Sequence, residues 1–280
     1  MACRDRLIRP LWPALVGTGA ALLACLVLAQ AIPAKAEEGD LYQATVIVTG
    51  TDMRSRPTGF ARALRQVLVK LSGETRLRND ARLDPFAVHA DRFVASFGYK
   101  DQMAGIKVHD DQGTYDRSYD LTVRFDPARI DKLLADLSER PFGGERKPIL
   151  PILRVRGVTG ATYLVSTEAP QAADQRVSLF NAGILYGTEI EVPRDKELAA
   201  LSVSVVQFPP ELGEAEPSRM LVSGTLDFQE SEPIGWVASF HTRFQGADYA
   251  WGIKGANFDE AVNEMTRGAL RLMSGHGAPQ

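Results

Sequence analysis

Cysteine is nearly absent from this chain of 280 residues. The sequence holds two, Cys3 and Cys25, and both lie in the first 36 residues. Without that segment, the chain contains no thiol. A disulfide scaffold, thiol catalysis and cysteine-based zinc or iron–sulfur sites are therefore excluded from residues 37–280.

Histidine is scarce, and recognisable catalytic motifs are missing. The four histidines show no H-E-x-x-H or similar metal-binding spacing; they are His89, His109, His241 and His276. The sequence has no G-x-S-x-G motif, and no glycine-rich loop lies between a predicted strand and a helix. We therefore predict no catalytic residue, no cofactor site and no metal site, and the sequence favours a protein that is not an enzyme.

A basic excess is also missing. From residue 37 onward the chain has 28 basic and 34 acidic residues, a formal net charge of −6. This balance argues against nucleic-acid binding, which requires a basic surface.

The first 36 residues have the layout of a secretory signal peptide. Arg4, Arg6 and Arg9 precede an uncharged stretch, residues 11–34, and Ala34-Lys35-Ala36 provides a small-x-small cleavage pattern. This order predicts cleavage before residue 37 and export of the folded chain to a bacterial periplasm.

Two alternatives for this segment stay open. Residues 11–34 are long enough to remain as an uncleaved membrane anchor. Leu22-Leu-Ala-Cys25 resembles a lipoprotein processing box, although the apolar run continues beyond the cysteine. In every case the folded part lies outside the cytoplasm, because the arginines stay inside.

Beyond the signal segment, the hydrophobic pattern predicts two small domains of mixed class, α+β and α/β. Residues 37–140 are expected to form a β-α-α-β-β-α unit, and residues 149–275 an α/β domain that ends in an antiparallel three-strand segment plus a helix. Two prolines and two glycines mark residues 141–148 as a linker, and residues 276–280 form a tail.

The clearest predicted helix spans residues 57–72. Apolar residues recur on one face, polar residues fill the other, and Gly73 ends the helix. The apolar face comprises Phe60, Leu64, Val67, Leu68 and Leu71. The polar face comprises Arg62, Arg65, Gln66 and Lys70. A second helix is expected over residues 84–97, with His89 partly buried on its flank.

Other elements follow from the same periodicities. Strands are expected over residues 41–48, 106–109, 115–125, 149–155, 189–192, 220–228, 235–244 and 249–253. Helices are expected over residues 126–137, 175–186, 195–201 and 258–272. Pro151 should limit its strand to a sheet edge or a bulge, because proline lacks an N–H group.

Several segments resemble one family of exported proteobacterial proteins. They are Phe60–Gly73, Leu41-Tyr42, Phe93–Tyr99, Tyr119–Phe125, Pro148–Leu153 and the β-rich segment Val222–Trp251, of which the first and the last carry most of the resemblance. The family is known as domain of unknown function two-zero-six-six, and the resemblance extends over nearly all of residues 37–280. It implies no catalytic residue. The C-terminal half is also similar in topology to small α/β domains of periplasmic accessory proteins, such as the amino-terminal domain of the Tol-system propeller protein.

Eight basic residues fall within residues 54–82 against two acidic ones. Six of them form the candidate contact surface: Arg62, Arg65, Lys70, Arg76, Arg78 and Arg82. Such a run is either a solvated helix face with its loop or a surface for a partner. The partner would be an envelope protein or an anionic membrane or lipopolysaccharide surface.

The sequence favours an exported envelope protein without catalysis, an accessory, scaffolding or interaction module. The alternative is a periplasmic module that binds a small molecule or an envelope polymer, between the domains or at the strand ends of the second domain. A hydrolase that uses two carboxylates is the third possibility.

Export predicts a specific mature terminus. Mass spectrometry of the envelope fraction should find a chain that starts near Glu37. A soluble cytoplasmic product that retains Met1 would contradict the prediction.

Overall fold

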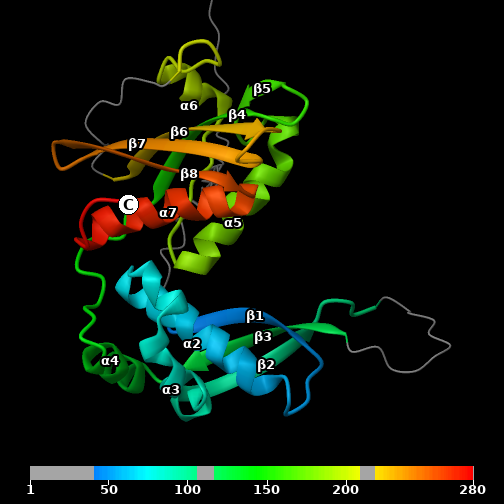
Figure 1. Cartoon of the computed structure of the whole chain (residues 1–280), viewed down its shortest axis with the longest axis vertical. Helices are drawn as coiled ribbons and strands as arrows, with labels where there is room; N and C mark the ends of the chain where they lie inside the picture. Colours follow the sequence, from blue (N-terminus) through cyan, green and yellow to red (C-terminus); the bar gives the residue numbers. More distant parts are fainter. Residues whose placement is uncertain (1–40, 106–116, 209–217, 280) are drawn as a thin grey trace, which may run out of the picture. The chain divides into compact units, whose positions relative to one another are not determined.

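The computed structural model describes residues 41–105, 117–208 and 218–279. Residues 35–280 form one compact unit, which contains two separate sheets (Figure 1). The mixed α and β fold class is confirmed, whereas the division of this unit into two domains stays a prediction. The signal segment, the strand expected over residues 106–109 and most of the loop before β6 lie outside the described residues.

The first sheet has three antiparallel strands in the order β1-β3-β2. They are β1 (Gln43–Thr49), β2 (Val94–Asp101) and β3 (Ser118–Phe125). Helix α2 (Arg56–Ser72) packs across one face of this sheet, and α4 (Pro127–Asp136) follows β3 (Figure 1). This arrangement places the polar side of α2 beside the edge strand β1.

Helix α2 confirms the predicted apolar face. Leu64, Val67 and Leu68 are fully buried between the helix and the sheet. The helix ends where the sequence indicates, because Gly73 adopts a left-handed φ of 73° and its N–H donates to the carbonyl of Val69 at 2.8 Å. Glycine adopts this conformation without steric cost.

The second helix predicted for this part of the chain is wrong. Short helical turns replace it: η1 (Thr75–Asn79), η2 (Ala81–Leu83), α3 (Asp84–Ala87) and η3 (Ala90–Phe93). From Val94 the chain is strand β2, in which Phe97 packs edge-on against Phe60 with ring centroids 5.2 Å apart. Pairing with β3 satisfies the backbone there, so tertiary context overrides a helical spacing of apolar residues.

The second sheet has five strands in the order β5-β4-β6-β7-β8. Only β4 and β6 among them pair in parallel. The strands are β4 (Ile149–Arg156), β5 (Thr162–Leu164), β6 (Met220–Gln229), β7 (Gly235–Phe244) and β8 (Ala247–Ala256). The helices of this part are η4 (Pro170–Ala172), α5 (Ala173–Tyr186), α6 (Asp195–Ala200) and α7 (Phe258–Ser274). The strand expected over residues 189–192 is reduced to one bridge, between Ile149 and Ile190.

Pro151 lies in a strand that is not at the edge, which corrects the prediction. Strand β4 lies between β5 and β6, but β5 reaches only Arg154–Arg156. Ile149, two residues earlier, directs its N–H and carbonyl away from β6, toward the backbone around Ile190. Backbone groups alternate with a period of two, so the missing N–H of Pro151 falls on that side and costs no bond to β6.

Buried apolar side chains from both sheets form one continuous cluster. Helix α7 approaches strand β8 closely at Gly268, where an added Cβ would lie 2.3 Å from the indole of Trp251. The Trp251 Nε1–H donates to the carbonyl of Glu264 at 3.1 Å. On the other face of β4, Leu198 of α6 packs with Leu150 in a second, smaller cluster.

Leu68→Ala tests the buried face of α2. Because Leu68 is fully buried, the substitution should lower the free energy of unfolding by about 2–5 kcal/mol. The matched control is Leu201→Ala, at a leucine that is 37% exposed, which should cost less than about 1 kcal/mol. Equal shifts of the two midpoints in denaturant unfolding would contradict this assignment.

Candidate functional site

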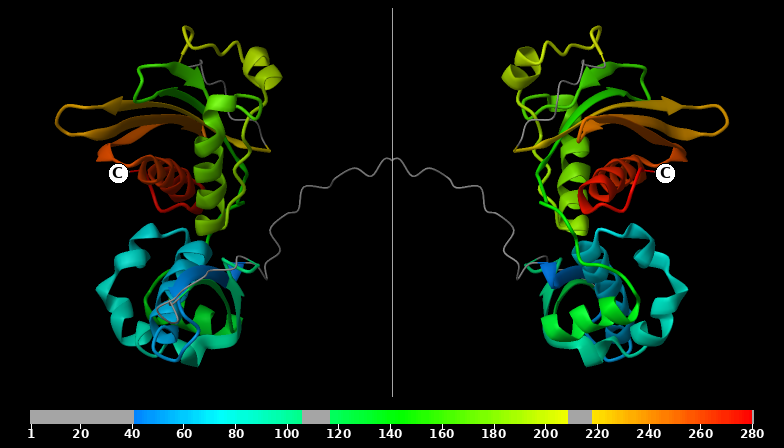
Figure 2. Two further views of the ribbon diagram at one scale, coloured as in Figure 1. Left: turned by 90° about the vertical axis from the view of Figure 1, so that its right-hand side faces the viewer. Right: turned by 90° about the vertical axis from the view of Figure 1, so that its left-hand side faces the viewer.

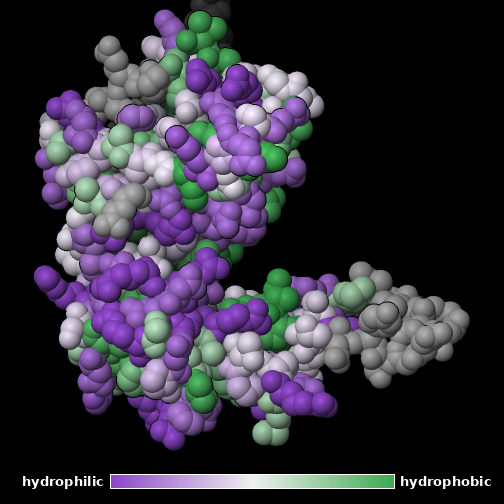
Figure 3. All heavy atoms as spheres, viewed as in Figure 1, coloured by the Kyte–Doolittle hydropathy of each residue, from purple (hydrophilic) through white to green (hydrophobic). Residues whose placement is uncertain are grey.

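The six basic residues of the candidate contact surface separate into three environments. Hydrophilic side chains gather over α2 in the space-filling view (Figure 3). Lys70 is not among the solvated ones, because it is only 6% exposed and its Nζ donates to the carbonyl of Gln43 at 3.0 Å. The placement of Lys70 on an open polar face was therefore wrong. The start of strand β1 passes beside the last turn of α2 and gives this ammonium its acceptor.

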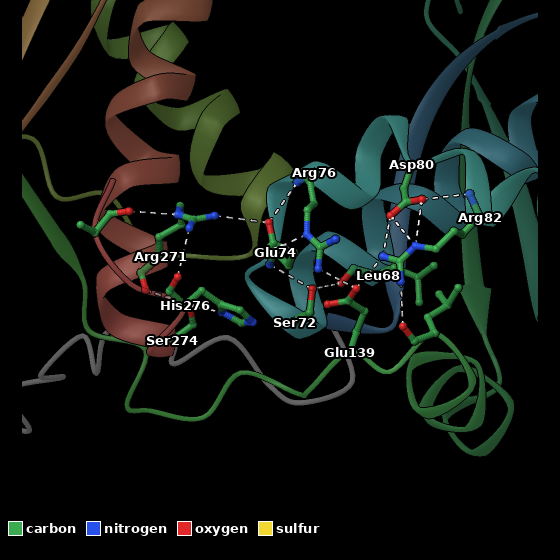
Figure 4. Close-up of polar contacts among 12 residues, drawn as sticks. Leu68, Ser72, Glu74, Arg76, Asp80, Arg82, Glu139, Arg271, Ser274 and His276 are labelled. Carbon is green, nitrogen blue, oxygen red and sulfur yellow. Dashed lines mark hydrogen bonds and ion pairs between the residues drawn. The ribbon is translucent and has the colours of Figure 1, made fainter. Parts of the chain in front are cut away.

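Arg76 and Arg82 share a buried carboxylate. Both donate to the same oxygen of Glu139, at 2.9 and 2.7 Å (Figure 4). Glu139 follows α4 and is only 8% exposed. A buried carboxylate needs such partners, since desolvation of an unpaired charge is costly. These two arginines therefore belong to the structural framework.

The same network continues toward the second sheet through Glu74. Its carboxylate lies 3.5 Å from the Arg76 Nε and 3.6 Å from the Arg271 Nη1 of α7 (Figure 4). Glu74 is only 4% exposed. Cations from two distant parts of the chain thus share one buried carboxylate.

Asp80 is bound by Arg82 through both side chain and backbone. The Arg82 guanidinium donates to both carboxylate oxygens, and its backbone N–H donates to Oδ1 at 2.9 Å. These hydrogen bonds, the side-chain ones first, lower the pKa of Asp80 to about 2. The ion pair therefore persists at every pH above the acid range.

The other three basic residues meet at a pocket. Arg62, Arg65 and Arg78 line a cavity of about 710 Å³ together with residues of β1, α2 and α5. This volume lies within the range of small-molecule binding sites, about 300–1,000 Å³. The lining also includes Ile47, Asp84 and Leu185. The pocket therefore joins basic groups to apolar side chains.

Two of the three arginines keep hydrogen-bond donors unused. Arg65 is fixed, because it donates to Asp84 at 2.6 Å and to the Asp80 carbonyl at 2.9 Å, and its side chain is 17% exposed. It was predicted to be exposed, and these acceptors from the following turns explain the difference. Arg62 donates from Nη2 to the Ile47 carbonyl at 2.5 Å, and Arg78 has no hydrogen bond or ion pair within the described ranges. Since a guanidinium carries five N–H donors, both can still bind an anion.

Arg146 fixes α5 beside α2 and so sets the pocket wall. It donates to the carbonyl of Lys70 at 2.5 Å and to that of Tyr186 at 3.2 Å, and it lies 4.0 Å from the ring centroid of Phe142. Burial lowers the pKa of Arg146 to about 10, so it stays charged at neutral pH. Both carbonyls are in the last turns of their helices, where the helix dipole favours a cation.

Sequence reasoning missed the groups that decide which arginines are free. Asp84 and Glu139 lie outside the basic stretch of residues 54–82, and Arg146 stands in the predicted linker. No spacing in the sequence marks them as partners of the arginines.

The histidines do not form a site. His89 is exposed rather than partly buried, because the helix that was expected to place it on an apolar flank is replaced by short turns. His241 is exposed as predicted, and the Nδ1 of His276 lies 2.6 Å from the Ser274 hydroxyl. His109 lies outside the described residues. Within the described ranges, no three His, Cys, Asp or Glu side chains are grouped to hold a metal ion.

Comparison with known proteins gives one match. A family model described as "Domain of unknown function (DUF8605)" matches residues 36–142, so this part of the chain contains a domain of unknown function. It is a different family model from the one that the sequence resembles. No curated protein and no solved structure matches the chain. None of the helices in the described parts is long and apolar enough to cross a membrane.

The pairing of Asp80 predicts an acid-dependent contribution to stability. Its pKa is lowered from 3.8 to about 2, so the carboxylate favours folding above the unfolded-state value and loses this effect as the pH falls toward about 2. Asp80→Asn should therefore lower the unfolding midpoint near neutral pH, and the difference from the wild type should shrink at low pH.

Denaturant unfolding at about pH 6 and about pH 2.5 measures this difference. The matched control is Asp136→Asn, since Asp136 forms an exposed ion pair with Lys132. An exposed ion pair contributes little to the free energy of unfolding. A difference between wild type and Asp80→Asn that stays constant with pH would contradict the prediction.

Proposed function

We propose that the protein is an exported, non-catalytic module of the bacterial envelope that binds an anionic group in the pocket of Arg62, Arg65 and Arg78. The observation that carries this proposal is a cavity in which Arg62 and Arg78 retain unused donors. A concave site with a few converging polar groups is typical of ligand binding. The site therefore favours a binding module over a flat scaffolding surface.

The location rests on the sequence. The basic start, the apolar stretch and the small-x-small pattern of the first 36 residues support export to the periplasm. The resemblance of Phe60–Gly73 to an exported proteobacterial family supports the same compartment and extends the proposal to that origin. The absence of a catalytic motif from the sequence supports a role in binding rather than turnover.

The charges of the pocket select the ligand class. Three guanidinium groups and the Asp84 carboxylate leave a formal surplus of two positive charges. A phosphate monoester carries about −1.5 to −2 at neutral pH, and arginine binds phosphate oxygens through paired N–H groups. Lipopolysaccharide phosphates and anionic lipid head groups are envelope anions that present phosphate oxygens. Outside the pocket, Arg76 and Arg82 add little, because Arg76 pairs with Glu74 and Glu139, and Arg82 with Asp80 and Glu139.

Isothermal titration of the purified protein with inorganic phosphate at low salt tests the proposal. Wild type should bind saturably, and Arg62→Ala combined with Arg78→Ala should weaken binding at least about tenfold, because one charged hydrogen bond contributes about 1.5–3 kcal/mol. Both residues are exposed, so their removal should leave the fold intact.

The matched control removes two positive charges outside the pocket. Arg54→Ala with Arg92→Ala suits this purpose, since the Arg54 side chain is 94% exposed and Arg92 is also exposed. This control should bind phosphate as the wild type does. Equal losses in the two double variants, or no saturable binding by the wild type, would overturn the proposal.

A further inference from the structure

Helix α5 carries an apolar stripe on its outer side. Leu179, Ala182 and Tyr186 face the core, yet Val177 is 58% exposed, Phe180 67% and Ile184 47%. Spacings of three and four residues align the exposed side chains along one side of a helix. No other helix or strand stands in front of α5 in the left view of Figure 2. The stripe extends for about 10 Å at 1.5 Å per residue.

The stripe leads to the arginine pocket. Ile184 precedes Leu185, which lines the pocket, and Tyr186 closes the last turn of α5 there. Ile47 of strand β1 also lines the pocket and is 57% exposed. Both α5, through the stripe near Leu185, and β1, through Ile47, therefore present exposed apolar side chains near the pocket. Exposed apolar groups beside a pocket are typical of a ligand-binding site.

Charge complementarity limits what can occupy both regions. The pocket has a formal surplus of two positive charges from Arg62, Arg65 and Arg78 against Asp84, which fits a dianionic phosphate. The adjoining stripe of α5 consists of Val177, Phe180 and Ile184, so it offers a ligand only apolar contacts. An occupant that satisfies both has one anionic end and one apolar chain.

We propose that the ligand of this pocket is a single-chain phosphomonoester amphiphile, whose phosphate binds Arg62 and Arg78 and whose alkyl chain lies against Leu185, Ile47 and the stripe of α5. This inference rests on the proposed function, and it adds the apolar part of the ligand. It differs from a contact with a flat membrane, because one lipid molecule leaves the bilayer and binds in the cavity.

Three probes separate the two parts of the ligand. The probes are inorganic phosphate, butyl phosphate and dodecyl phosphate, the last used below its critical micelle concentration. Each is titrated into protein that was expressed from the full-length chain and purified in the form that the cell produces. Each buried methylene should tighten binding by about fourfold. Burial of only four extra methylenes thus predicts that dodecyl phosphate binds at least about 100-fold more tightly than butyl phosphate.

The test variant makes the stripe polar. Phe180→Gln with Ile184→Gln should reduce the affinity for dodecyl phosphate at least about tenfold, since each glutamine removes apolar contact surface. Its affinity for inorganic phosphate should stay at the wild-type value, which also shows that the variant is folded. The matched control is Val158→Gln with Ile234→Gln, two residues that are each 62% exposed and outside the pocket lining. It should bind all three probes as the wild type does.

The outcomes distinguish this inference from the proposed function. If all three phosphates bind equally, the arginine pocket stands and the apolar chain is refuted. If dodecyl phosphate binds Arg62→Ala with Arg78→Ala as tightly as the wild type, the proposed anion site is refuted. If the stripe variant changes only the oligomeric state, measured by light scattering, the stripe is a protein interface and the inference is overturned.

Discussion

The contact on which the pocket depends is made by the partly buried guanidinium of Arg146. It joins the last turn of α2 to the last turn of α5 through the carbonyls of Lys70 and Tyr186. Helix ends carry unpaired carbonyls that must be satisfied once water is excluded. One cation satisfies two helices here, with the ring of Phe142 beneath it. Its desolvation is offset only while both helices stay in place, so the two sheets are coupled by a charge rather than by apolar packing alone.

Ion pairs with two buried carboxylates likewise hold the turns that follow α2 against neighbouring elements. Glu139 binds Arg76 and Arg82, and Glu74 binds Arg76 and Arg271. Because each carboxylate is buried, loss of its arginine partners would leave a charge without compensation. Arg146 and this network therefore hold the end of α2 and the following turns against α4, α5 and α7. These contacts position α2 and α5, and residues of both helices line the pocket.

The sequence predicts the parts of this structure that rest on local rules. The apolar face of α2, its end at Gly73 and the final three strands follow from periodicity and from glycine at a left-handed position. The turns and strand around Phe97 were misread as a helix, because β2 is stabilised by β3, which follows it in the chain. Likewise, the sequence pattern of α5 is only weakly amphipathic. This helix has apolar residues on two sides, and only one of these sides faces the core.

The candidate site could be located from the sequence but not resolved into its parts. A basic stretch marks the region. Counting the charges within residues 54–82, however, does not tell which arginines are already paired and which can still bind an anion. In the folded chain Asp84 binds Arg65, Glu139 binds Arg76 and Arg82, and the Gln43 carbonyl binds Lys70. Recognition of an anion requires donors that the protein has not already used, and tertiary contacts alone decide this. The cationic groups that keep unused donors at the cavity are thus Arg62 and Arg78.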